Sequence, residues 1–474
     1  MCKSDSTAGT KVPDYKLSAN IHSRAKELLI IGGVVGRDFS GRRLRTIIII
    51  HGIRDSATVI RTTTTRIIQI PSELFGILHE NHFIIMKKIL FDVPIEDVFS
   101  AYYDCRKHKR NKVGALAFEI DSETNLIKLW DELQTGEYNI LPSTVFIVDK
   151  PIKREIFAAN FRDRIVHHLL LMYLNPYFEK YFIYDTYSCR VSKGTHFGIK
   201  RINHFIHKCS DNGKSECWIL KLDVQSFFMS IDKRILFERL IDFVDTYYKE
   251  ANVDFVKYLL KEIIWNNPTK DSIFHSPKTK WDDLIFGKSL FDVDENHGLP
   301  IGNFTSQVFA NFYLSKLDHF IKHDKKIEYY GRYVDDFVII HKSKETLKKF
   351  IHEIDDFLKS NLGLKLNPKK IYLQPYHHGV RFLGTFIKQN HIIANNRIYK
   401  NFRKSIYKNT LLAVNHKPTK EERNHFISSV NSYLGILKHY KTYNRRSQIL
   451  KNEISDLWLK QIAVYGKSEK IIKK

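Results

Sequence analysis

The chain has 474 residues, of which 43% are hydrophobic and 13% aromatic, and this composition excludes a mostly disordered protein. Its 76 Lys and Arg outnumber its 52 Asp and Glu, which gives a net charge of +24. Because the excess is spread along the chain and not held in one tail, it favours a nucleic-acid partner; a basic proteome or a membrane-surface protein is the alternative explanation.

The cysteines and the apolar runs indicate the compartment. Five cysteines are scattered along the chain and form no CxxC pair, which is typical of thiols in a reducing environment. No apolar run reaches the roughly 18 residues that span a bilayer, and the amino terminus has no signal-peptide pattern. We therefore expect a soluble cytoplasmic protein that does not act at a membrane.

Residues 1–85 differ in texture from the rest of the chain. Between Thr46 and Ile70 there are nine Ile and six Thr in 25 residues, without a helical period or clean alternation. One interpretation is an irregular β-hairpin extension. The other is translated upstream DNA, because ATA and ACA codons read one base earlier become Asn codons; Met86 would then be the working start.

Helices and one strand are predicted between residues 86 and 240. An amphipathic helix is expected from about Ile95 to Arg106, and residues 161–182 predict two helical segments interrupted at Pro176. The run WILKLDV at 218–224 reads as a buried strand, and residues 226–240 turn helical. Asp223 therefore ends a strand before a helix, where it is either an active-site carboxylate or a helix cap.

A second pair of carboxylates stands at a predicted turn. Asp335 and Asp336 lie between the apolar, aromatic-rich runs 329–334 and 337–340, which predicts a tight β-hairpin with an acidic tip. An exposed acidic turn is the plain alternative. If the strands that carry Asp223 and Asp335 are neighbours, the carboxylates converge into a site for two Mg²⁺ ions, with Mn²⁺ as a substitute.

Two further elements surround this predicted centre. The glycines of GLPIGN at 298–303 allow close backbone approach, and an amphipathic helix is expected after them, so this loop can lie against a nucleotide or a base pair. Phe228 follows Asp223 closely. Its ring is either a core aromatic or a barrier that crowds a ribose 2′-hydroxyl and so favours deoxynucleotides.

Residues 400–460 are helix-rich and basic. Tyr433, Tyr440 and Tyr443 alternate there with basic residues such as Lys438 and Arg445. This mixture suits contact with a duplex backbone and exposed bases. The alternative is an ordinary solvated helical face.

Five ordered motifs carry a resemblance to reverse transcriptases: LKLDVQSFF at 220–228, GLPIGNFTSQ at 298–307, YVDD at 333–336, GLKLNPKK at 363–370 and VRFLG at 380–384. The resemblance implies an α+β, right-hand polymerase fold. Its fingers would span residues 86–200 and its palm residues 201–390, with an antiparallel sheet that bears the YVDD hairpin. A helical thumb would span residues 391–474.

The resemblance also implies an RNA-directed DNA polymerase that uses two Mg²⁺ ions, deoxynucleoside triphosphates, a template RNA and a cDNA or primer. Catalysis and metal binding would fall to the three carboxylates Asp223, Asp335 and Asp336. The residues implied in nucleotide binding are Lys153, Arg154, Arg162, Phe228, Ile301, Gly302, Asn303, Gln307 and Lys369. The residues implied in template or primer binding are Tyr333, Arg381, Phe382, Leu383, Gly384, Lys438 and Arg445.

Within that superfamily the form IGNxxSQ, from Ile301 to Gln307, is similar to the reverse transcriptases of diversity-generating retroelements. This likeness implies a bacterial or phage enzyme that copies a template-repeat RNA with errors at adenines to diversify a target gene. It also implies a small basic accessory protein oligomer as partner. Having Ile301 where relatives carry a polar Gln removes a donor and an acceptor beside the nucleotide, which can loosen discrimination at template adenine.

The same likeness favours translated upstream DNA as the interpretation of residues 46–70, because template repeats in that family are rich in AAY codons, which give Ile and Thr codons in a shifted frame. Two alternatives to the diversifying role stay open. One is another bacterial reverse transcriptase, from a group II intron, a retron or an antiphage defence system. The other is an inactive nucleic-acid-binding scaffold.

Overall fold

The computed structural model of the whole chain describes residues 28–37, 43–51, 87–107, 109, 111–149, 152–285, 287–412 and 416–474. Most of the extension predicted at residues 1–85 lies outside these ranges. In the described part, β1 (Leu28–Arg37), β2 (Arg43–His51) and β3 (Lys87–Ile89) form an antiparallel sheet in that order. The register of β1 against β2 shifts between Ile30 and Gly33.

Two compact units divide the chain, one made of residues 1–99 and 117–139 and the other of residues 100–116 and 140–474. In the first unit the indole nitrogen of Trp130 donates to the Val93 carbonyl at 2.7 Å. The helix predicted from Ile95 to Arg106 is confirmed with those bounds. The helices of this region are α3 (Ile95–Arg106), α4 (Val113–Glu119) and α5 (Ser122–Thr135).

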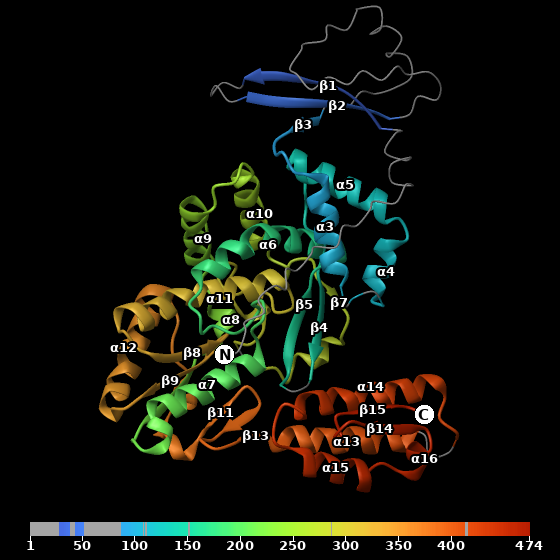
Figure 1. Cartoon of the computed structure of the whole chain (residues 1–474). Coiled ribbons are helices and arrows are strands. Elements are labelled where there is room, and N and C mark those ends of the chain that lie inside the picture. The colour runs from blue at the N-terminus through green and yellow to red at the C-terminus, as the bar shows by residue number, and fades with distance from the viewer. Residues whose placement is uncertain are drawn as a thin grey trace, which may run out of the picture. The chain divides into compact units, whose positions relative to one another are not determined.

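The second unit begins with a three-stranded sheet. In it β4 (Thr144–Val148) pairs antiparallel with β5 (Arg154–Ala158) and parallel with the short β7 (Ile273–Phe274). Figure 1 shows these three strands side by side. Residues from one side of β4, such as Val145, are buried, as expected for a strand with one face against a core.

The helix α6 (Phe161–Tyr181) corrects a prediction, because it runs through Pro176 without interruption. Proline removes one helical hydrogen bond and usually breaks the element. Here the buried Phe178 stacks with Phe243 and lies against Phe312 on the far side of the proline. This aromatic packing holds the last turn in the helix.

A four-stranded antiparallel sheet lies at the centre of the second unit. Its strands, in spatial order, are β10 (Tyr372–Pro375), β6 (Trp218–Asp223), β9 (Asp336–His341) and β8 (Tyr329–Tyr333). The predicted hairpin is confirmed, since β8 and β9 are joined by a two-residue turn. The helix α7 (Thr195–Cys209) packs on one face against Val338 and Ile340, and lies beside β8 and β9 in Figure 1.

Two helix predictions near this sheet were confirmed as helix and wrong in detail. Residues 226–240 form two helices, α8 (Phe227–Ser230) and α9 (Lys233–Tyr247), because Asp232 between them caps α9 by accepting from the amides of Arg234 and Ile235. The helix α11 (Phe304–His319) is buried on nearly every face and so is not amphipathic. It packs against α6 and α12 (Lys344–Leu362), which leaves it little solvent-facing surface.

The remaining helix of this part is α10 (Val253–Trp265). A small antiparallel sheet then follows, with strands β11 (Val380–Phe382), β12 (Thr385–Ile387) and β13 (Ile392–Ala394). Among the described residues, no helix combines the length and apolar character needed to cross a membrane.

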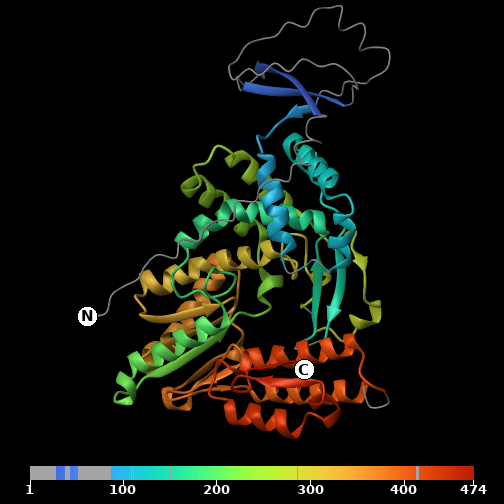
Figure 2. The same ribbon diagram turned by 45° about the vertical axis from the view of Figure 1, so that its right-hand side comes forward.

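The carboxyl-terminal part is helical and has its own core, which includes Phe402, Phe426 and Trp458. Figure 2 shows its helices gathered around the short hairpin of β14 (Ile462–Tyr465) and β15 (Lys470–Lys473), all in red. The sequence did not predict this hairpin. The elements are α13 (Asn396–Leu412), α14 (Lys420–Leu437), α15 (Tyr443–Asn452), α16 (Asp456–Leu459), β14 (Ile462–Tyr465) and β15 (Lys470–Lys473).

Candidate active site

Three carboxylates meet at one edge of the central sheet. Asp223 is the last residue of β6 and stands directly opposite Asp336, the first residue of β9. Asp335 precedes Asp336 in the turn that joins β8 to β9. Side chains of directly opposed residues are about 5 Å apart at Cβ, so Asp223 and Asp336, which are 113 positions apart in sequence, become neighbours.

The turn itself is strained. Val334 has φ of +56°, a conformation that a β-branched residue rarely adopts. Such strain costs on the order of 1–3 kcal/mol and persists only where surrounding contacts hold it. In this turn the holding contact is a hydrogen bond of 2.8 Å from Arg332 Nη1 to the Val334 carbonyl.

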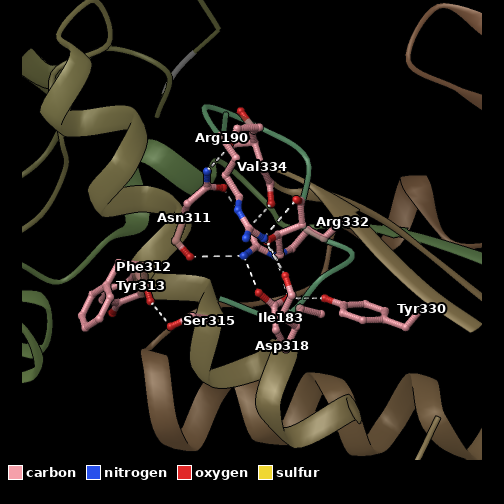
Figure 3. Close-up of polar contacts among 12 residues, drawn as sticks. Ile183, Arg190, Asn311, Phe312, Tyr313, Ser315, Asp318, Tyr330, Arg332 and Val334 are labelled. Carbon is pink, nitrogen blue, oxygen red and sulfur yellow. Dashed lines mark hydrogen bonds and ion pairs between the residues drawn. The ribbon is translucent and has the colours of Figure 1, made fainter. Parts of the chain in front are cut away.

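Arg332 belongs to a buried polar network behind the turn (Figure 3). Its guanidinium forms a bidentate pair with Asp318 of α11, at 2.7 and 2.5 Å, and both side chains are fully buried. The Tyr330 hydroxyl donates to the same carboxylate at 2.6 Å, and Asn311 accepts from Arg332 at 3.2 Å. The network therefore links the helix α11 to the carboxylate turn.

Two lysines pair with the carboxylates. Lys370 Nζ lies 2.8 Å from both oxygens of Asp223, and Lys221 Nζ lies 3.1 Å from Asp336 Oδ2. Lys221 is a diagonal neighbour of Asp336 across β6 and β9, on the same face as Asp223. These cations balance part of the negative charge that the three carboxylates bring together.

Burial and mutual repulsion shift two of these carboxyls. Burial, and then the Asp223 carboxylate, raises the pKa of Asp335 to about 6, against the opposing charge of Lys370. Burial raises the pKa of Asp336 to about 7, although Lys221 opposes the rise. At neutral pH a fraction of each of these two carboxyls is therefore protonated, and binding of a divalent cation would release those protons.

The residues at this edge fit a divalent cation of the magnesium type. Carboxylate oxygens are the ligands that such hard cations prefer, together with substrate phosphates and water. Asp336 Oδ1 is buried and has no hydrogen-bond partner, so a ligand atom is available. In the part of the chain that the structure describes, no three His, Cys, Asp or Glu side chains form a complete metal-binding group by themselves.

The predicted basic residues of residues 150–164 have different surroundings. Arg154 begins β5, and its charge acts on the Asp335 carboxyl. Lys153 Nζ pairs instead with Asp283 at 3.3 Å. Arg162 is partly buried and pairs with the adjacent Asp163 at 3.3 Å. Of the three, Arg154 is thus the cation that the structure brings into electrostatic range of the carboxylates.

The predicted nucleotide loop contacts β5 through its backbone. The Ile301 carbonyl accepts from the Phe157 amide at 2.8 Å, and Asn303 Oδ1 accepts from the Ala159 amide at 3.1 Å. A Cβ on Gly302, which has φ of +134°, would lie 2.5 Å from the Phe157 carbonyl oxygen. Glycine at this position therefore permits a close approach to the β5 backbone, while the predicted approach to a nucleotide or a base pair stays a prediction.

The side chains predicted to bind the nucleotide in and around this loop have different surroundings. Ile301 and Phe228 both pack against one apolar cluster, whose buried members are Val145, Phe157, Met229 and Leu290. Asn303 is buried and holds the Ala159 amide, so its side chain supports the loop. Gln307 is exposed on α11, where the Cys189 thiol donates to its amide oxygen at 2.9 Å.

The other predicted residues lie around the sheet edge and the following small sheet. Lys369 precedes Lys370 in a short 3₁₀ turn, and Lys370 is the one that reaches Asp223. Tyr333 and Leu383 pack on the core beneath α7, in which Phe382 is buried. Arg381 is exposed, and Gly384, with φ of +79°, completes the tight turn between β11 and β12.

In the carboxyl-terminal part, Lys438 is exposed at the end of α14. The Arg445 guanidinium lies 3.8 Å from the Tyr399 ring centre and donates to Asn396 at 3.2 Å. Arg445 also lines a groove of about 590 Å³ together with Tyr440, Lys441 and Tyr443. Of the predicted mixture, Tyr440, Tyr443 and Arg445 therefore line one groove, whereas Tyr433 packs on the core and stacks with Phe402.

The sequence interpretation missed Lys221, Lys370, Arg332 and Asp318. For Lys221 a signal existed, since strand residues two apart share a face and Lys221 precedes Asp223 by two. Arg332 also left a signal, because a charge inside an apolar strand is seldom buried without a partner. Its partner Asp318 left none, and neither did the choice of Lys370 over Lys369.

An antiparallel sheet with converging carboxylates at a hairpin turn, backed by helices, defines a polymerase-type catalytic domain. Residues 150–387 match the family model described as reverse transcriptase (RNA-dependent DNA polymerase). That match spans half of the chain, and the protein belongs to this family. Its α+β fold and its class as an RNA-directed DNA polymerase follow from this membership.

Among curated proteins, the chain is similar to YkfC of Escherichia coli (strain K12), with 23% identity over 54% of this chain and 69% of YkfC. It is also 26% identical to a COX1/OXI3 intron 2 protein of Saccharomyces cerevisiae. That alignment covers 56% of this chain and only 34% of the yeast protein, so the chain spans about a third of that relative's length.

Solved structures of telomerase also resemble the chain. Apo telomerase from Candida tropicalis aligns with a TM-score of 0.40 and 12% identity, over 68% of this chain and 56% of that one. Telomerase from Candida albicans, in complex with a fragment of telomeric RNA, aligns with a TM-score of 0.38 and 12% identity. The latter alignment covers 66% of this chain and 56% of the telomerase chain.

Proposed function

We propose that this reverse transcriptase copies a template-repeat RNA into cDNA with errors concentrated at template adenines, as part of a diversity-generating retroelement. The observation that carries the proposal is the surroundings of Ile301. This side chain packs with Phe228 on an apolar cluster, so the loop offers no polar side-chain group at that position. A pocket that hydrogen-bonds its substrate rejects wrong partners strongly, whereas an apolar wall discriminates weakly.

The proposed chemistry is phosphoryl transfer at Asp223, Asp335 and Asp336. Two Mg²⁺ ions, when bound by these carboxylates, would stabilise the attacking and leaving oxygens. Arg154 is in range to attract the incoming triphosphate, and Lys221 and Lys370 balance the carboxylate charge. Template RNA, a primer or cDNA, and a small basic accessory protein are the proposed partners.

A second candidate is the role of an intron-encoded reverse transcriptase. The similarity to the yeast COX1/OXI3 intron 2 protein favours it. The two candidates share the polymerase chemistry and differ in the error spectrum, because only the diversifying role calls for errors directed at adenine.

The test is primer extension on a defined RNA template with Mg²⁺, followed by sequencing of the cDNA. We expect substitutions opposite adenine to exceed those opposite the other bases, and we expect Ile301→Gln to reduce this excess. Asp335→Asn should abolish extension, as should removal of the metal by a chelator. An even error spectrum in the native enzyme, or an unchanged spectrum in Ile301→Gln, would contradict the proposed function.

A further inference from the structure

Glu155 is a buried carboxylate that three donors surround. The side chain, on β5, is only 2% exposed. It accepts from Trp281 Nε1 at 2.6 Å, from the Ser289 hydroxyl at 2.7 Å and from the Leu290 amide at 2.7 Å. All three donors belong to the connection between α10 and α11, so a single side chain binds this connection at two places.

The same connection covers β4 and β5 in other ways. Its strand β7 extends their sheet, and its Phe291 ring packs against Phe157 of β5 with ring centres 5.6 Å apart. An exposed ion pair, Lys280 with Asp149 at 2.9 Å, lies at its margin. Glu155 differs from these contacts because a buried carboxylate is costly unless its hydrogen bonds are satisfied.

The connection between α10 and α11 also contributes to the apolar cluster on which Ile301 of the predicted nucleotide loop packs; this cluster with Phe228 and Ile301 is called the wall below. Leu290 is one of the buried members of the cluster on which Ile301 and Phe228 pack, and Trp281 packs on that cluster too. On the other side, Phe157, two residues after Glu155, donates its amide to the Ile301 carbonyl. The Glu155 contacts and the Ile301 position are therefore fixed by the same short stretch of β5.

We propose that Glu155 is a positioning residue that sets nucleotide selectivity, by holding the Trp281–Leu290 segment against the wall formed by Phe228 and Ile301. The inference rests on the proposed function in one respect, the assignment of that wall to the nucleotide pocket. Glu155 does not touch substrate. It acts through Trp281, Ser289 and Leu290, and loss of any one donor lets the wall shift.

The experiment changes Glu155 or one of its side-chain donors at a time in the full-length chain. Trp281→Phe keeps an aromatic side chain with a smaller ring and loses the Nε1 donor. Ser289→Ala loses the hydroxyl, which also accepts from the Phe291 amide at 3.2 Å. Glu155→Gln replaces one carboxylate oxygen by an NH2 group, which donates and does not accept. Single-nucleotide extension then gives kcat and KM for correct and incorrect nucleotides opposite each template base. Thermal unfolding shows that each variant is folded.

We expect each variant to lower the ratio of kcat/KM for correct over incorrect nucleotides by about twofold to tenfold, with kcat for the correct nucleotide close to the native value. This range corresponds to part or all of one hydrogen bond to a charged acceptor. Asp149→Asn is the matched control, because it breaks the exposed pair of the same segment, and its selectivity should be native.

Unchanged selectivity in the folded variants, or a loss of kcat that is equal for all nucleotides, overturns the inference. So does an equal effect of Asp149→Asn. The proposed function fails separately: a native enzyme with no excess of errors at adenine would contradict the diversifying role, while the selectivity ratios opposite all four bases would still decide whether Glu155 positions the pocket.

Discussion

Arg332 and Asp318 form an ion pair that is fully buried directly behind the carboxylate turn. Replacing such a pair by apolar residues is often neutral for stability, whereas removing one partner leaves an uncompensated charge. Stability alone therefore does not explain a buried guanidinium here. Its hydrogen bond to the strained Val334 carbonyl gives it a second role, the placement of Asp335 and Asp336.

These two roles can be separated by mutation. We expect Arg332→Met to lower the free energy of unfolding by about 3–5 kcal/mol, because Asp318 stays buried without its partner. The double variant Arg332→Met/Asp318→Leu should regain most of this stability. Primer extension should remain low in both variants, since neither can donate to the Val334 carbonyl.

Chemical denaturation and extension rates over a range of Mg²⁺ concentrations provide the two readouts. Lys325→Met is the control for stability, because it breaks a partly exposed pair with Glu353 and should cost about 0–1 kcal/mol. If the double variant extends primers at the native rate, the turn does not depend on Arg332.

At the scale of elements, α6 and α11 contact each other through a buried histidine. His167 of α6 is 4% exposed, and its Nδ1 lies 3.2 Å from the Thr305 hydroxyl of α11. Burial lowers the pKa of His167 to about 3, and the nearby charges of Arg164 and Lys109 act in the same direction. The imidazole is therefore neutral in the folded protein over most of the acidic range.

Because His167 stays neutral in the folded protein, the free energy of unfolding should fall in acid. Below the ordinary histidine pKa of about 6.5 the unfolded chain binds a proton that the folded chain does not, so His167 lowers stability progressively from pH 6.5 down to about 3, by at most about 1.4 kcal/mol per pH unit. In His167→Gln this contribution is absent. Denaturation curves over that pH range should therefore fall less steeply for His167→Gln than for the native chain.

Thr305→Val is the matched variant for this prediction. It removes the hydroxyl beside His167 and leaves the imidazole, so it should lower stability at every pH and keep the native slope. Parallel pH curves for His167→Gln and the native protein would show that this histidine does not carry the acid sensitivity.

Element positions were predictable where a local pattern decides them. Ile95–Arg106 and the hairpin of β8 and β9 followed from apolar periodicity and a turn. Pro176 within α6 and the break at Asp232 did not, because aromatic packing across the proline and a capping side chain overrode the local pattern. The burial of α11 on nearly all faces likewise depends on its neighbours α6 and α12.

At the scale of the whole molecule, the net charge of +24 has a measurable consequence. A protein that neutralises phosphates releases counterions, so its affinity for a primer–template duplex falls steeply as salt rises. The exposed Lys438 and the groove lined by Tyr440, Lys441 and Arg445 are candidate phosphate contacts.

We expect the dissociation constant for an RNA–DNA primer–template to increase with salt on a logarithmic plot, and Lys438→Ala to reduce the slope by about one. Fluorescence anisotropy at several salt concentrations measures the dissociation constant and hence the slope. Lys359→Ala should keep the native slope, because Lys359 is paired with Asp355 on α12. An unaltered slope for Lys438→Ala would remove Lys438 from the duplex contact.

The sequence by itself predicted the reverse transcriptase family through its five ordered motifs, and with it the α+β class. It also predicted that Asp223, Asp335 and Asp336 converge, because strand ends and turns leave local signals; their catalytic role stays a prediction. The tertiary structure decided what surrounds them. Lys370 on Asp223, Arg332 with Asp318 behind the turn, and Glu155 with its three donors each join segments distant in the chain. Such partners are selected by charge balance and burial in the folded core, and no local pattern records them.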